Sequence, residues 1–162
     1  MSSFDQNINH LRQFIIAVKI FPPTQTQNDY DAAYQSAIDY GALVDTGANG
    51  CSISEKVVAD LNLQPHGQVE MTTAGAPHTT SVYLVGMAVS VTETEMRPEK
   101  QADGNTILKP FSVAETARGF RDIKVTSFPD IGLDRGFDII LGMDMLLHFH
   151  ITMYRGKIVI SI

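Results

Sequence analysis

Short apolar runs separated by polar turns dominate the chain, and their spacing predicts strands more often than helices. Segment 14–21 is rich in β-branched and aromatic residues and ends at a pair of prolines, which favours a strand bounded by a turn. Segments 41–45 and 137–141 contain short, almost continuous apolar runs, as in strands buried on both faces. Segments 150–154 and 157–162 predict a C-terminal hairpin, since isoleucine alternates with other residues along the second of them.

Helical patterns are few and short. Ser52 and Glu55 have the spacing of a capping box, and Val57, Val58 and Leu61 follow on one helical face, so a helix is predicted to run to about Leu61. After the polar loop 24–29, residues 30–38 predict a short helix or an irregular insert. Residues 142–147 predict another short helix directly after an apolar strand.

The middle of the chain predicts two hairpins. Residues 69–73 and 79–91 have strand patterns around a turn at 74–77, so 68–91 is expected to form a hairpin that could close over a site as a flap. An ordinary hairpin shows the same pattern. Residues 92–125 are charged and rich in turn formers, which predicts an extended hairpin or surface loop. That segment either shapes substrate choice or is a solvated elaboration with no role.

Composition restricts the class of protein. A length of 162 residues, 44% hydrophobic and 19% charged, indicates one globular domain over 1–162. A net charge of −6 argues against nucleic acid or an acidic membrane surface as a partner. The single cysteine suits a reducing compartment, and the apolar stretch 14–18 is too short to span a membrane. We therefore expect a cytoplasmic location.

The most informative motif is Asp45-Thr46-Gly47, which follows an apolar run and precedes Ala48. Far along the chain, a second apolar run, Ile139-Ile140-Leu141, also ends in glycine, Gly142. The pair resembles the two halves of the active site of the aspartic proteases, specifically the single-domain retropepsin-like, or retroviral-type, class. The resemblance implies a mainly β, closed-barrel acid-protease fold with one or two short helices, assembled as a symmetric homodimer.

The chemistry of that class requires two carboxylates. Carboxylates about 3 Å apart share one proton, so the ionised one can activate a water while the protonated one polarises a peptide carbonyl. Asp-Thr-Gly occurs once and Asp-Ser-Gly is absent, and Asp144 lacks the small neighbours that would expose a carboxylate at a turn. A second copy of Asp45 must therefore come from another chain, and twofold dimers are the commonest oligomers.

Roles for the remaining site residues follow from the resemblance. It implies an endopeptidase in which Asp45 is catalytic, Thr46 and Gly47 support the paired loops, and no cofactor or metal is needed. Polypeptide substrate would lie against Gly47 and Ala48 and under the flap turn at Ala74-Gly75. Because the two carboxylates titrate as a coupled pair, we expect activity to favour mildly acidic pH.

Two residues differ from the retroviral pattern. Retroviral members commonly have aspartate and arginine, which form an ion pair, at the positions of Asn49 and Met143. Both charges are absent here, so neither leaves an unpaired partner. The cellular or bacterial branch of the class is therefore the better match.

Several alternatives stay open at the level of sequence. Cys51 could be a nucleophile, although a small buried residue is the simpler interpretation because no histidine is near it in sequence. His148 and His150 are two residues apart but make only half of a zinc site. The whole domain could also be a proteolytically silent dimer that holds an extended peptide by strand addition, or a purely structural or regulatory dimer. Phosphorylation of Asp45 is a remote further option.

Overall fold

The computed structural model describes residues 3–7, 13–73, 76–101, 104–129, 136–154 and 157–161. Within them, strands predominate and three short helices occur, so the predicted mainly β fold is confirmed. The strands are β1 (Ser3–Asn7), β2 (Ile15–Phe21), β3 (Ile38–Val44), β4 (Ser52–Ser54), β5 (Gly67–Thr73), β6 (Ala76–Lys100), β7 (Thr106–Phe128), β8 (Ile139–Leu141), β9 (His150–Tyr154) and β10 (Lys157–Ser161). The helices are α1 (Gln27–Ser36), α2 (Glu55–Asp60) and α3 (Met143–Leu146).

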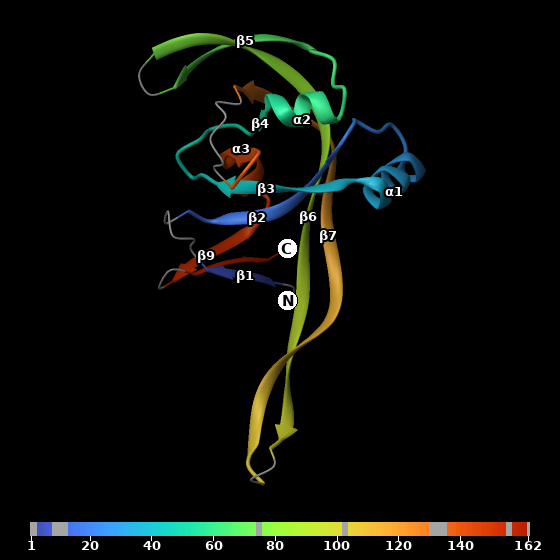
Figure 1. The fold of residues 1–162 in the computed structure, drawn as a ribbon, viewed down its shortest axis with the longest axis vertical. Helices are drawn as coiled ribbons and strands as arrows, with labels where there is room; N and C mark the ends of the chain where they lie inside the picture. The colour runs from blue at the N-terminus through green and yellow to red at the C-terminus, as the bar shows by residue number, and fades with distance from the viewer. Residues whose placement is uncertain are drawn as a thin grey trace.

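Two sheets organise the described residues. The larger has the strand order β2-β3-β8-β4-β7-β6-β5, and an additional antiparallel pairing of β2 with β6 closes six of these strands into a barrel. The smaller sheet has the order β1-β10-β9 and brings the two ends of the chain together beside the barrel (Figure 1). The β9–β10 pairing confirms the predicted C-terminal hairpin, whereas β1 has no counterpart among the strands predicted from the sequence.

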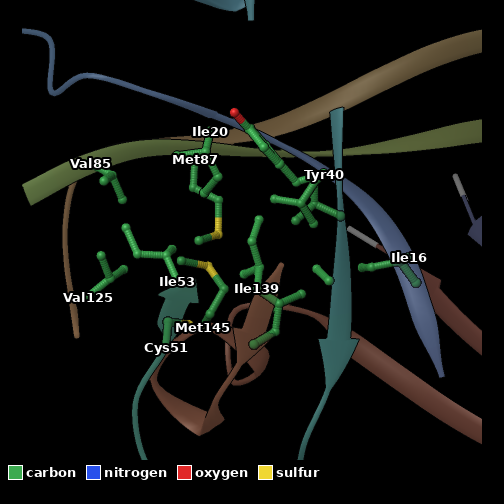
Figure 2. Packing of buried hydrophobic residues seen from close by; sticks show 14 of the residues in the cluster. Ile16, Ile20, Tyr40, Cys51, Ile53, Val85, Met87, Val125, Ile139 and Met145 are labelled. Atoms are coloured by element: carbon green, nitrogen blue, oxygen red, sulfur yellow. The ribbon is translucent and has the colours of Figure 1, made fainter. Parts of the chain in front are cut away.

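Alternation along the barrel strands builds the core. In β2 the side chains of Ile16, Val18 and Ile20 are buried, while Ala17 between them is exposed, because successive residues of a strand point to opposite faces. The same alternation in β3 buries Tyr40, whereas Met87 lies in a run of consecutive buried residues, 85–89, in β6. Figure 2 shows these side chains converging from several strands into one cluster. The barrel is thus filled with side chains and holds the strand ends in place.

Two hairpins share the long strand β6. Its first residues pair with β5 from Thr73↔Ala76 to Gly67↔Val82, so a hairpin forms within the predicted segment 68–91. Ala76 and Pro77, which were predicted to be part of the turn, already belong to β6. The other predicted turn residues, Ala74 and Gly75, lie outside the described residues. The rest of β6 pairs with β7 as far as Lys100↔Thr106. This extended hairpin, the first of the two alternatives for 92–125, runs well beyond the barrel (Figure 1).

Two details of the helix predictions were wrong. The α2 helix is capped by Ser54, whose Oγ accepts a hydrogen bond from the Val57 N–H, and not by Ser52. Ser52 instead belongs to β4, where its Oγ lies 2.7 Å from the Thr126 Oγ1 of the adjacent β7. The α1 helix begins inside the predicted loop 24–29, because Thr26 caps it by accepting a hydrogen bond from the Asp29 N–H.

Candidate active site

The two sequence motifs meet in the barrel. Strands β3 and β8 are parallel neighbours with Val44 paired to Leu141, and the N–H of Asp45, just past the end of β3, donates to the Leu141 carbonyl at 3.1 Å. The predicted pairing of Asp-Thr-Gly with the distant apolar-Gly segment is therefore confirmed. Asp45 directly follows β3, in which alternate residues are buried, and its backbone is hydrogen-bonded to the neighbouring strand β8.

A tight turn holds the Asp45 carboxylate. The Gly47 N–H donates to Asp45 Oδ1 at 2.8 Å, and the Ala48 N–H donates to the Asp45 carbonyl at 3.2 Å. Aspartate commonly closes turns by bonding the backbone two residues on. The side chain of Asp45 is half-buried, while Thr46 and Gly47 are exposed. The turn therefore presents an oriented carboxylate at the surface of a rigid domain.

The rest of the loop rests on the segment that follows β8. The Met143 N–H donates to the Ala48 carbonyl at 2.8 Å, and the Asp144 N–H donates to the Asn49 carbonyl at 3.1 Å. Asn49 and Met143, the positions at which retroviral members commonly carry an ion pair, each take part in one of these backbone bonds, but with different partners. The loop and the start of α3 are thus connected without charged side chains at Asn49 and Met143.

Gly142 allows this close approach. A Cβ atom at Gly142 would lie 2.5 Å from both the carbonyl carbon and the carbonyl oxygen of Gly50. Its φ of −86° is accessible to any residue, so the requirement for glycine is steric. The glycine that ends the distal motif is therefore explained by the backbone of the loop packed against it.

Cys51 and Asp144 join the far end of the loop to α3. The Cys51 N–H donates to Asp144 Oδ2 at 3.1 Å, and the thiol donates to Asp144 Oδ1 at 3.0 Å. The Gly142 N–H in turn donates to the Cys51 sulfur at 3.4 Å. Burial, reinforced by the hydrogen bond to Asp144, raises the pKa of the Cys51 thiol to about 12. Cys51 is 2% exposed, so the simpler interpretation of it as a small buried residue is confirmed.

The Asp144 contact went unrecognised in the sequence. The available signal in the sequence is the position of Asp144 directly after the distal Gly142-Met143. The structure shows both of its carboxylate oxygens accepting hydrogen bonds from Cys51. Asp144 therefore belongs to the support of the Asp45 loop.

The histidines do not form a metal site in the described part of the chain. No group of three or more histidine, cysteine, aspartate or glutamate residues suited to holding a metal ion occurs among the described residues. His148 lies in the turn after α3, with its ring centroid 5.1 Å from that of Phe120. The His150 Nε2 lies 3.3 Å from the Thr152 hydroxyl.

None of the described helices has the length and apolar character needed to cross a membrane.

Comparison with known proteins identifies related chains. A model of the family described as aspartyl protease matches residues 34–145, a span that includes both motifs. No curated protein sequence matches the chain. Among solved structures, the chain is similar to the crystal structure of a retropepsin-like aspartic protease from Rickettsia conorii. That comparison has 14% sequence identity and a TM-score of 0.48, and it covers 98% of this chain and 89% of the other.

Proposed function

Because the chain belongs to the aspartyl protease family, we propose that it is an aspartic endopeptidase that acts as a homodimer. The observation that carries this proposal is the Asp45 turn. A half-buried carboxylate is oriented by the Gly47 N–H, and its loop is bonded to β8 and to the start of α3. Catalysis by positioned carboxylates needs this preorganisation, because the reacting groups must be held close to their productive geometry.

The second carboxylate of the dyad comes from a second copy of the chain. Among the described residues, Asp144 is the acid whose side chain is hydrogen-bonded to the far end of the Asp45 loop, and both of its carboxylate oxygens accept hydrogen bonds from Cys51. A twofold axis at the Asp45 turn would instead bring two copies of the same carboxylate face to face. Thr46, exposed beside Asp45, would then hydrogen-bond across the axis and hold the paired loops together.

The reaction follows from one proton shared by two carboxylates. The ionised Asp45 removes a proton from a water molecule as the water oxygen bonds to the peptide carbonyl carbon, while the protonated Asp45 donates its proton to the carbonyl oxygen. In the collapse of the tetrahedral intermediate the C–N bond breaks, and the Asp45 that took the water proton gives it to the leaving nitrogen. The other Asp45 takes back a proton from a hydroxyl of the intermediate as the new carboxyl group forms. The chemistry uses water and the two carboxylates alone.

The hairpin of β5 and β6 is the proposed flap. Exposed Val69 and Glu70 lie along β5, whose one described pairing partner is β6. This hairpin lies at the end of the molecule opposite the extended β6–β7 hairpin (Figure 1). Closing it over Gly47 and Ala48 would hold an extended polypeptide and exclude bulk water from the dyad.

Replacing Asp45 by asparagine tests the proposal. The Asp45→Asn variant is expected to fold and dimerise as the wild type does, because the amide oxygen can still accept from Gly47, yet to lose cleavage of a peptide library. Asp39→Asn is the control, since it removes the same charge from an exposed position of β3, the strand that ends directly before Asp45. The Asp39 carboxylate lies 3.7 Å from the Lys19 Nζ, away from the loop. Cleavage that persists in Asp45→Asn, or a chain that is monomeric by sedimentation while fully active, would refute the proposal.

One observation favours a second candidate function. Asn49 and Met143 lack the charges that support the cleft in retroviral enzymes, which is compatible with a domain that binds extended peptides by strand addition without cutting them. Peptide binding that survives Asp45→Ala, together with no cleavage of any unfolded protein by the wild type, would select this alternative.

A further inference from the structure

The carboxylate of Asp144 connects the start of α3 to the loop that carries Asp45. It accepts hydrogen bonds from the Cys51 N–H at 3.1 Å, from the Cys51 thiol at 3.0 Å and from the Met145 N–H at 2.8 Å. Hydrogen bonds to an ionised acceptor are about twice as strong as those between neutral groups. The Asp144 side chain is therefore hydrogen-bonded to a residue 93 positions away in the sequence.

These bonds lie at the point where the loop re-enters the barrel. Cys51 is followed at once by β4, whose three residues are all buried, and its carbonyl accepts from the Thr126 N–H of β7 at 3.2 Å. At its other end the loop leaves β3 at Asp45. With both ends in the barrel, the path of the five residues between Asp45 and Cys51 depends on the contacts made along the loop.

The backbone contacts along the loop converge on the same segment. Ala48 and Asn49 accept from the N–H groups of Met143 and Asp144, and Gly50 packs on Gly142. The Asp144 side chain adds the next contact, at Cys51, so the whole loop is in register with residues 142–144. A shift of that register would move the Asp45 turn relative to β8.

We propose that Asp144 is a positioning residue that sets the orientation of the Asp45 carboxylate through Cys51. This proposal rests on the proposed function for its catalytic consequence, although the contact itself is independent of activity. In this role Asp144 acts on catalysis by fixing the loop through Cys51. The buried thiol takes part as a hydrogen-bond donor, and its raised pKa keeps it protonated in that role.

The test compares Asp144→Ala with Asp122→Ala. Asp122 is an exposed acid on β7 that lines the same surface hollow as Asp144, so its replacement removes an equal charge from the same place. Asp144→Ala is expected to lower kcat about 10- to 100-fold, because small displacements of a catalytic group have effects of that size. The KM should change little, since the loss falls on transition-state stabilisation. Asp122→Ala should match the wild type.

Two further readouts separate positioning from a general loss of folded protein. Asp144→Asn keeps an acceptor oxygen, so it should recover part of the kcat lost in Asp144→Ala. In isotopically labelled protein, Asp144→Ala should speed hydrogen exchange of the Cys51 amide and shift the carboxyl carbon signal of Asp45. Asp122→Ala should leave both signals unchanged.

The outcomes are distinct from those that test the proposed function. An active wild type with unchanged kcat in Asp144→Ala overturns the positioning role but leaves the protease assignment intact. An inactive wild type overturns the protease assignment, and the carboxyl carbon signal of Asp45 then decides alone whether Asp144 positions the Asp45 carboxylate. An unshifted signal in Asp144→Ala overturns the proposal, whereas a shifted signal supports it.

Discussion

Adding one methyl group at Gly142 should disturb the candidate active site more than the same change at Gly47 or Gly50 in the Asp45 loop. The Cβ of an alanine there would lie 2.5 Å from the carbonyl carbon and oxygen of Gly50 and 2.8 Å from its nitrogen. Carbon atoms in ordinary contact are about 3.5–4.0 Å apart. The loop and β8 must therefore separate by about 1 Å, and no flexible side chain is available to absorb the movement.

The magnitude follows from two opposing effects. Overpacking of this kind costs about 1–3 kcal/mol, whereas replacing glycine by alanine stabilises a protein by about 0.4–1 kcal/mol through the unfolded chain. The φ of −86° and ψ of 178° at Gly142 suit alanine, so no backbone strain is added. The free energy of unfolding should fall by about 1–2 kcal/mol. Since the Asp45 loop is displaced, kcat should fall by up to about 100-fold.

Urea unfolding of Gly142→Ala, measured beside Gly67→Ala, isolates the steric effect. A Cβ at Gly67 meets no atom within 4 Å, and its φ lies outside the left-handed region, so that variant keeps only the unfolded-state gain. With an m-value of about 2 kcal/mol/M, Gly142→Ala should lower the unfolding midpoint by about 0.5–1 M, while Gly67→Ala should leave it unchanged or raise it slightly. Equal midpoints in the two variants would refute the reasoning.

Two further changes test the support of the loop and of α2. The pKa of Cys51 is raised to about 12 from an ordinary 9.0. The protonated thiol therefore contributes up to about 4 kcal/mol to the free energy of unfolding below pH 9, and this contribution is lost as the pH rises toward 12. Between pH 9 and 11 the wild type should lose more stability than Cys51→Ser in thermal unfolding, and parallel curves for the two proteins would contradict the burial of the thiol. Ser54→Ala removes the cap of α2 and a 3.2 Å hydrogen bond from the Ser54 hydroxyl to Asp138 Oδ1. The free energy of unfolding, measured by chemical denaturation, should therefore fall by about 1–2 kcal/mol. An unaltered unfolding midpoint would exclude Ser54 as the cap.

The strands and the meeting of the two motifs were predictable because each has a local signature. β-Branched and aromatic residues followed by two prolines mark β2 as a strand, and the apolar runs around Leu43 and Ile140 mark β3 and β8 as strands of the core. Once both are placed in one barrel, the residue after each strand falls at the same edge. The hairpin at 68–91 was likewise visible, because a turn signal separates two strand patterns.

Caps and loop contacts were not predictable because they depend on the partner that each side chain meets. Ser52 and Ser54 are both serines close to the start of a helix, and only the pairing of β4 with β7 and β8 shows that Ser52 is still in a strand. The bonds from Asp144 to Cys51 join residues 93 apart, so no local pattern contains them. The approach of Gly142 to Gly50 is hidden for the same reason.

The parallel pairing of β3 with β8 also determines when the Asp45 turn can exist. Nearly a hundred residues separate Val44 from its partner Leu141, and contacts so distant in sequence form only after the loop between them has closed. A nascent chain that has been synthesised only as far as β7 contains Asp45 but lacks the segment against which its turn is built. Formation of the turn therefore waits until β8 has been synthesised, which delays any hydrolytic potential until that point.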